Sequence, residues 1–372
     1  MPFFATAAKG TEPALRDELR ELRFRNVRAD RGGVHFEGDS SEGYRACLWS
    51  RIAVRILEPR ATFDAPGERA LYDGVRALDL SDAIDPKRTL VVSAACRSSR
   101  LTHTQYLAQL TKDAIVDRIR DATGARPNVD KRDADVHVFV HLVKDVATLY
   151  LDLAGEPLHR RGYREPGGEA PLKETLAAAV LRLSHWDRES PLADPMCGSG
   201  TLLLEAALWA RNIAPGLSRG RFGFERFCRF DAAEAARWQE LREQARGVQL
   251  AEGPELFGSD TDRDVLDRAA RSAELAGVDI SLMWQELRDY PAKSSPGALI
   301  SNPPYGRRLE RGVNLPRELA ALIDRHPGAN VALLMAADQP MGRTERRPEP
   351  PHQLWNGDIE CVVRRYAASG AR

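Results

Sequence analysis

The sequence predicts an α/β protein in which a doubly wound parallel sheet follows an N-terminal α+β region. Two patterns support this class: short apolar strands alternate with helices in the second half, and hairpins and alternating strands mark the first half. The composition is that of a globular protein, with 43% hydrophobic and 29% charged residues, and excludes collagen, coiled coil and bulk disorder. A length of 372 residues allows two or three domains.

Charge and cysteine content limit the functional classes. Lysine plus arginine equals aspartate plus glutamate at 54 each, so local basic patches must hold any nucleic-acid partner. No apolar run is long enough to span a membrane, and the start of the chain lacks a signal-peptide pattern. Five cysteines without paired spacing argue against disulfides and zinc fingers. We therefore expect a cytoplasmic protein with no membrane and no metal.

Residues 1–43 predict a small α+β unit. Phe3–Thr6 is a short apolar strand, and a helix begins after it with Thr11 as its N-cap. Gly32-Gly33 separates two short strands, 24–29 and 34–37, as a hairpin turn does. A unit of this size buries too little surface to be stable on its own.

Residues 44–162 predict a second unit. The expected elements are a buried strand over 90–95, an amphipathic helix over 104–122, and strands over 136–142 and 147–153 joined at Lys144-Asp145. His137 and His141 share the outer face of one of these strands. We interpret them as solvent-side residues, because no third metal ligand lies near them in the sequence.

Residues 163–372 predict the doubly wound sheet. The expected strands are 192–194, 256–260, 282–284, 298–301 and 330–336, and helices are expected at 201–211 and 263–276. In such sheets ligands bind at the carboxyl ends of the strands. Side chains that follow a strand end are therefore the candidates for a site.

The first candidate is the glycine-rich turn Asp194-Pro195-Met196-Cys197-Gly198-Ser199-Gly200-Thr201, which follows a strand and opens a helix. Glycines let the backbone approach a ligand, and a helix N-terminus presents N–H groups to an anion. The dinucleotide fingerprint and the P-loop are both excluded, because the third glycine and the lysine are missing. A carboxylate before small residues suits a ligand with a carboxylate and an amine, such as S-adenosylmethionine. A plain strand-to-helix turn is the alternative.

The next strand end supports a nucleoside ligand. Asp260 stands where a ribose would lie and can accept hydrogen bonds from both hydroxyls. The alternative is that Asp260, together with Asp262, caps the following helix. Glu286, past the third strand, can accept from an adenine amine.

The second candidate is Asn302-Pro303-Pro304-Tyr305-Gly306, at the end of the fourth strand. The prolines stiffen the turn, and the Asn302 amide and the Pro303 carbonyl provide two acceptors for an exocyclic –NH2 group. Tyr305 offers a face for stacking, and the base must be single-stranded or flipped out to reach it. The signal favours amine methylation over a proline-rich turn with a buried tyrosine.

These motifs resemble the bacterial 23S ribosomal RNA guanine-N2 methyltransferases. The matching runs are Lys173–Ala179, Asp194–Thr201, Gly258–Asp260 and Asn302–Gly306, with Gly32–Phe36, Lys112–Asp117, Arg126–Asp130 and Leu158–Arg164 in the first half. The resemblance implies a ferredoxin-like piece at 1–43, a THUMP RNA-binding domain at 44–162 and a class I (Rossmann-like) methyltransferase domain at 163–372. Two departures are the absence of a second methyltransferase unit before Arg372 and a short stretch over 307–329.

Roles follow for individual residues. We assign cofactor-binding roles to Asp194, Pro195, Cys197, Gly198, Gly200, Thr201, Asp260 and Glu286, and catalytic roles to Asn302, Pro303, Pro304 and Tyr305. The resemblance implies that Asp194, Gly198 and Gly200 line the methionine end of S-adenosylmethionine and that Asp260 holds its ribose. The expected reaction is an in-line displacement that needs no side-chain nucleophile or metal.

Basic clusters are the candidate RNA contacts, although each can also be a solvated face. They comprise Arg97, Arg100, Arg160, Arg161, Arg219, Arg221, Phe222 and Arg307, and the stretch 219–230 interleaves cations with aromatics. The expected partner is 23S rRNA or a large-subunit precursor, with no obligate protein partner and a monomeric state. The alternatives are methylation of transfer RNA and a non-catalytic RNA-binding assembly factor.

Overall fold

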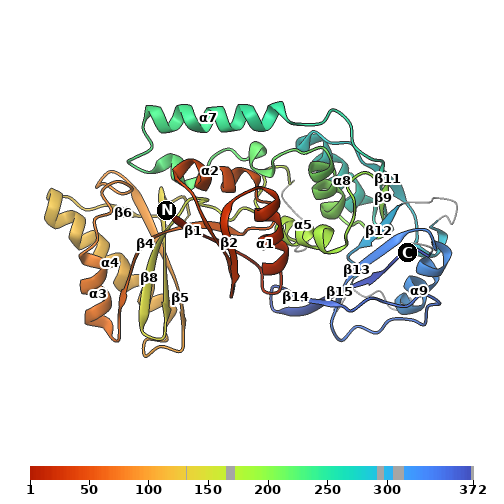
Figure 1. Cartoon of the computed structure of the whole chain (residues 1–372), viewed down its shortest axis with the longest axis horizontal. Helices are drawn as coiled ribbons and strands as arrows, with labels where there is room; N and C mark the ends of the chain where they lie inside the picture. Colours follow the sequence, from red (N-terminus) through yellow and green to blue (C-terminus); the bar gives the residue numbers. More distant parts are fainter. Residues whose placement is uncertain (131, 165–171, 291–296, 305–313, 370–372) are drawn as a thin grey trace.

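Two sheets, each with its own helices, make up the molecule (Figure 1). The computed structural model describes residues 1–130, 132–164, 172–290, 297–304 and 314–369. Within these residues, no helix is long and apolar enough to cross a membrane. The predicted α/β class is confirmed, and the prediction that the second half forms a doubly wound sheet is confirmed in detail below.

The N-terminal sheet has eight strands in the order β2-β3-β1-β4-β8-β7-β5-β6. Its strands are β1 (Pro2–Thr6), β2 (Arg25–Asp30), β3 (Gly33–Glu37), β4 (Arg55–Asp64), β5 (Thr89–Arg97), β6 (Asn128–Val129), β7 (Val136–Val143) and β8 (Val146–Asp152). Its helices are α1 (Glu12–Glu21), α2 (Ser40–Trp49), α3 (Glu68–Arg76) and α4 (Thr104–Thr123). The strands and helices expected from the sequence are all present.

One continuous sheet joins the two units that the sequence separates at residue 43. β1 pairs with both β3 and β4, and α2 runs across the expected boundary. The small first unit therefore shares its core with the second, which removes the difficulty of stabilising so short a chain. Thr11 does occupy the N-cap position of α1, but its hydroxyl donates to the Ala8 carbonyl (2.7 Å) instead of accepting from the helix.

The β7–β8 hairpin shows the expected alternation of buried and half-buried residues. Lys144 and Asp145 at its turn both have positive φ, as a tight hairpin of this twist requires. His137 and His141 are half-buried, and burial lowers the pKa of each imidazole. Their expected solvent-side position is thus only partly correct. Among the described residues, no group of three His, Cys, Asp or Glu side chains can hold a metal.

The C-terminal sheet has seven strands in the order β11-β10-β9-β12-β13-β15-β14. They are β9 (Leu192–Asp194), β10 (Leu256–Asp260), β11 (Ser281–Trp284), β12 (Ala298–Ser301), β13 (Asn330–Ala336), β14 (His352–Asn356) and β15 (Ile359–Tyr366), with helices α5 (Glu174–Leu183), α6 (Thr201–Ala210), α8 (Arg263–Ala276), α9 (Leu315–Arg325) and the short η3 (Leu287–Asp289). β9 to β13 are parallel, and β15 is antiparallel to both of its neighbours.

Helices cover both faces of this sheet. Side chains of α5, α6 and α8 pack with Ile300 on one face, whereas those of α9 pack with Leu299 on the other. Neighbouring residues of a strand point to opposite faces, so a short apolar run is buried on both sides. Because the five strands β9 to β13 are parallel, their carboxyl ends all lie at one edge of the sheet, and the candidate residues follow these ends.

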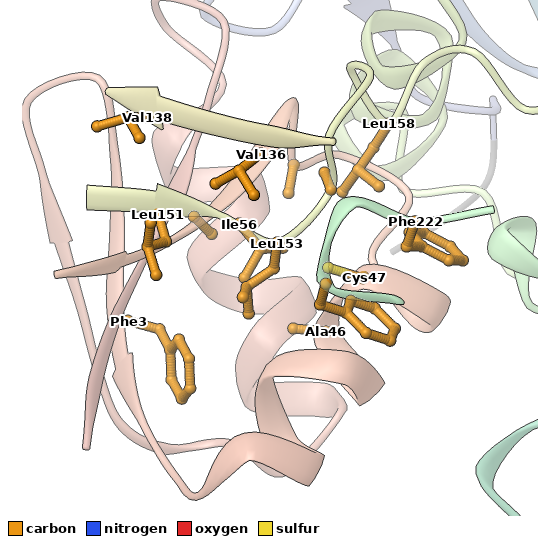
Figure 2. Close-up of a cluster of buried hydrophobic side chains, with 14 of the residues drawn as sticks. Phe3, Ala46, Cys47, Ile56, Val136, Val138, Leu151, Leu153, Leu158 and Phe222 are labelled. Carbon is orange, nitrogen blue, oxygen red and sulfur yellow. The ribbon is translucent and has the colours of Figure 1, made fainter. Parts of the chain in front are cut away.

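A segment between β9 and β10 returns to the N-terminal half. It contains η1 (Pro215–Ser218), η2 (Gly223–Arg226) and α7 (Ala232–Gly247), which runs along one side of the molecule (Figure 1). Phe222 belongs to the same buried cluster as Ala46 and Cys47 of α2 (Figure 2). Phe224 stacks on Tyr44 with ring centroids 4.0 Å apart, and Trp238 is also buried there. The segment is therefore part of the N-terminal core.

Candidate active site

The glycine-rich turn connects β9 with α6 at the open edge of the sheet. Gly198 and Gly200 have φ of +52° and +75°, a backbone region that a side chain would strain. The Cys197 N–H donates to the Ser259 carbonyl (2.9 Å), and the Gly198 N–H donates to Oδ2 of Asp260 (2.8 Å). The turn is thus tied to the end of β10 by hydrogen bonds within the protein.

Asp260 and Asp262 have different functions in the structure. Asp262 is the N-cap of α8 and accepts from the N–H groups of Asp264 (2.9 Å) and Val265 (3.3 Å). Asp260 is half-buried, and its Oδ1 accepts from the Asp262 N–H (3.1 Å). Since Asp262 alone caps the helix, capping does not explain Asp260, and its carboxylate lies against the glycine-rich turn.

Asp194 links the glycine-rich turn to the next strand end. It is 1% exposed, and its Oδ1 accepts from the Ser301 hydroxyl (2.6 Å) and the Met196 N–H (3.2 Å). Burial raises the pKa of Asp194 to about 7, and the charge of Asp260 adds to the shift. The sequence analysis assigned no role to Ser301, although a serine at the end of an apolar strand could have indicated one.

The Asn-Pro-Pro turn begins at the residue after Ser301. Oδ1 of Asn302 is buried and has no hydrogen-bond partner among the described residues. The Pro304 carbonyl accepts from Nε2 of Gln339 (3.2 Å), a side chain that is 8% exposed and follows β13. Gln339 was also missed, because it lies 35 residues away in the sequence. Tyr305 and Arg307 lie outside the described residues.

The remaining residues of the glycine-rich turn hold it in place. The Thr201 hydroxyl accepts from Arg164 (3.3 Å), which also pairs with Glu174 at the start of α5 (2.7 Å). The Pro195 carbonyl accepts from the Ser259 hydroxyl (3.2 Å). Cys197 is buried, and burial raises the pKa of its thiol. Its thiol is thus an inert packing group.

Glu286, past the third strand end, is exposed and forms an ion pair with Arg288. Its contact with an adenine amine stays a prediction. Trp284, which pairs with Asp260 in the β10–β11 register, is 58% exposed and donates its indole N–H to the Thr261 carbonyl (2.9 Å). This indole is an aromatic surface next to Asp260 that sequence reasoning missed.

Three of the expected RNA contacts are buried, and that prediction is wrong for them. Arg161 is 2% exposed and pairs with the fully buried Glu205 (3.2 Å), which also accepts from the Tyr163 hydroxyl. Arg219 is 6% exposed and donates to backbone carbonyls, and Phe222 belongs to the core. Buried charges need such partners because water is excluded. These residues join the two halves of the chain.

The other basic candidates that the structure describes are exposed, so an RNA role for them stays a prediction. Arg97 and Arg100 lie at the end of β5 and in the loop after it. Arg160 pairs with Glu156 (2.7 Å) and Arg221 pairs with Asp133 (3.0 Å). Ion pairs at a solvated surface are weak and exchange readily for a phosphate.

The strand order, the glycine-rich turn tied to Asp260, and the Asn-Pro-Pro turn beside it define a class: the S-adenosylmethionine-dependent methyltransferases that act on nucleic acids. Family models agree along most of the chain. They match an RlmL ferredoxin-like domain at residues 2–57, a THUMP domain at 67–152 and an RMKL-like methyltransferase domain at 161–329. The chain has these three domains in this order, which matches the family of THUMP-containing 23S rRNA methyltransferases.

Solved structures are similar over the full length. A protein from Listeria monocytogenes, described as an N6-adenine-specific DNA methylase, is 29% identical, with 97% of this chain and 95% of that chain covered and a TM-score of 0.84. The methyltransferase SMU.472, complexed with SAH, is also 29% identical, with 100% and 99% covered and a TM-score of 0.87. TrmN from Thermus thermophilus shares the fold at 21% identity, with 99% of each chain covered and a TM-score of 0.69.

Proposed function

We propose that the protein transfers a methyl group from S-adenosylmethionine to the exocyclic N2 of a guanine in 23S ribosomal RNA. The observation that carries the proposal is the Asn302 amide oxygen, which is buried without a partner among the described residues at the end of β12. A buried acceptor without a donor is costly, and a substrate –NH2 group would satisfy it.

The cofactor fits the neighbouring strand ends. Asp260 offers its carboxylate to the ribose hydroxyls, and the backbone at Gly198 and Gly200, which has positive φ and no side chain, allows a close approach at the methionine end. When bound, S-adenosylmethionine supplies an electrophilic methyl group on a positive sulfur. The buried Asp194 carboxyl, with its raised pKa, becomes more acidic near that charge.

Catalysis then depends on orientation. Asn302 Oδ1 and the Pro303 carbonyl would each accept one hydrogen of the amine, which turns the nitrogen lone pair out of conjugation with the base. Gln339 and the two prolines hold this turn still, so that positioning supplies most of the acceleration. The amine keeps its protons until the methyl group has moved, because a neutral amine is hard to deprotonate first.

RNA is favoured as the substrate because the chain contains a THUMP domain beside the RlmL ferredoxin-like domain. The Listeria protein is described as a predicted N6-adenine-specific DNA methylase, which makes adenine in DNA one competing substrate. Transfer RNA, the alternative that the sequence leaves open, is the other. A base must leave its helix to reach the Asn-Pro-Pro turn in either case.

The test offers deproteinised 23S rRNA, transfer RNA and double-stranded DNA to the purified protein with isotope-labelled cofactor. Mass spectrometry of the digested nucleosides identifies the product. We expect labelled N2-methylguanosine from 23S rRNA, and Asn302→Ala should lower turnover by at least about 1,000-fold while SAH affinity changes little.

Asn330→Ala is the matched control, since Asn330 starts β13 at the opposite edge of the same sheet. It should turn over like the wild type. N6-methyladenine as the product, a strong preference for transfer RNA, or full activity of Asn302→Ala would each overturn the proposal.

A further inference from the structure

An open cavity of about 490 Å³ lies where three parts of the chain meet. Its walls come from the segment after β1, from the start of α5 and from the β14–β15 hairpin. The lining residues are Ala8, Lys9, Val54, Lys173, Thr175, Leu176, Trp355, Asn356, Gly357 and Asp358. None of them has a role in the site described above.

The cavity opens at the same edge of the sheet as the active site. β13 and β14 both run antiparallel to β15, so β14 is parallel to β9, β12 and β13. The end of β14 at Asn356 is therefore at the carboxyl edge. On the other wall, Arg164 connects Glu174 of α5 to Thr201 of the glycine-rich turn (2.7 and 3.3 Å).

The walls are held in place by the N-terminal part of the chain. The Trp355 N–H donates to the Lys9 carbonyl (3.0 Å), and the His352 imidazole hydrogen-bonds the Gly10 carbonyl (2.7 Å). The cavity thus exists only because the ferredoxin-like piece packs on the methyltransferase sheet.

Two lysines provide positive charge without a carboxylate partner among the described residues. Lys9 and Lys173 are exposed, and the Lys9 ammonium lies 3.3 Å from the centre of the Trp355 ring. The pKa of the His159 imidazole is lowered to about 4, first by burial and then by the positive charges of Lys173 and nearby arginines. Asp358 is the one acidic residue among those that line the cavity.

The polar groups in the walls match a nucleotide. The Thr175 hydroxyl is buried and has no hydrogen-bond partner among the described residues, and Thr175 itself is 2% exposed. Trp355 contributes apolar surface for a base or a sugar, and the Asp358 carboxylate can accept from a ribose hydroxyl or a base amine. Ammonium groups beside an aromatic ring are typical of sites that bind single-stranded nucleic acid.

We propose that this cavity binds a nucleotide of the RNA strand outside the target base, with its phosphate on Lys9 and Lys173. The inference rests on the proposed function and names a second contact of the same substrate. It gives the ferredoxin-like piece a part in substrate binding, because that piece supplies Lys9.

The experiment uses the full-length protein and a fragment of the RNA that the wild type methylates. Lys9→Ala/Lys173→Ala should raise the KM for RNA about ten-fold and leave kcat and SAH affinity unchanged. The slope of log Kd against log salt should fall by about 0.7, since the two lysines share one phosphate and each phosphate contact to a single strand contributes about 0.7. Trp355→Ala should weaken binding several-fold without changing that slope, and Trp355→Phe should recover most of it.

The control variant Arg237→Ala/Arg246→Ala removes two positive charges from α7, away from the cavity, and should keep the wild-type slope. SAH binding by calorimetry verifies that each variant is folded. If the lysine variant keeps the wild-type KM and slope while the wild type methylates the RNA, the cavity proposal is wrong and the proposed function stands. If the wild type neither methylates nor binds RNA, both the proposed function and the cavity proposal are wrong.

Discussion

The two turns at the ends of β9 and β12 are neighbours, yet they use their polar groups in opposite ways. In the glycine-rich turn the N–H groups of Met196, Cys197 and Gly198 already donate to protein oxygens. In the Asn-Pro-Pro turn the Asn302 amide oxygen has no partner among the described residues. The first turn is a backbone cradle held by the protein's own hydrogen bonds, and the second keeps the acceptor that we propose for the substrate amine. Ser301 and Asp194 connect them.

The largest effect that tests this comparison concerns Asp260. Asp260→Ala removes both the anchor of the Gly198 N–H and the acceptor for the ribose, so SAH affinity should fall at least about 100-fold in calorimetry. Asp262→Ala is the control: it removes the cap of α8 and should lower the melting temperature while it leaves affinity nearly unchanged. Wild-type affinity in Asp260→Ala would show that the cradle forms without it.

An intermediate effect is expected at Asp194, where the turns meet. The pKa of Asp194 is about 7 in the folded protein, whereas the ordinary value is 3.8. Its contribution to the free energy of unfolding is therefore complete below about pH 4 and is lost as the pH rises through 7. Asp194→Asn keeps an acceptor for Ser301 and cannot ionise. Its melting temperature should exceed that of the wild type by about 5 °C at pH 8 and by little at pH 5. The same difference at both pH values would contradict the assignment.

The smallest effect should come from Gln339, which supports only the second turn. Gln339→Glu keeps the size of the side chain but loses the donor to the Pro304 carbonyl, so kcat should fall about three- to ten-fold with SAH affinity unchanged. Gln244→Ala on α7 is a control outside the site. A change in SAH affinity, rather than in kcat, would mean that the two turns are more tightly coupled than the contacts indicate.

Much of this site could be predicted because its signals are local. The helix expected over 263–276 has those bounds in α8, and the glycine-rich turn, Asp260 and Asn302 all follow strand ends. Parallel strands bring their carboxyl ends to one edge, so the order of elements along the chain was enough to place these residues together. The β14–β15 hairpin was not predicted, and it supplies one wall of the cavity.

The arginines show where the same reasoning fails. Arg160 and Arg161 are neighbours in the sequence, yet one is exposed and the other is buried against Glu205. A cluster of cations looks the same in the sequence in both cases, because burial depends on what packs over it. Here that cover comes from the segment around Arg219 and Phe222, which returns to the N-terminal core.

The sequence by itself determined the alternation of β9–β13 with helices, the glycine-rich turn and the stiff Asn-Pro-Pro turn, since backbone preferences and strand alternation act between near neighbours. Only the tertiary structure decided which polar groups are satisfied by the protein and which remain for a ligand. Ser301 meets Asp194 across 107 residues, and Gln339 meets Pro304 across 35. Such pairings form when the chain buries its apolar surface, and no local pattern encodes them.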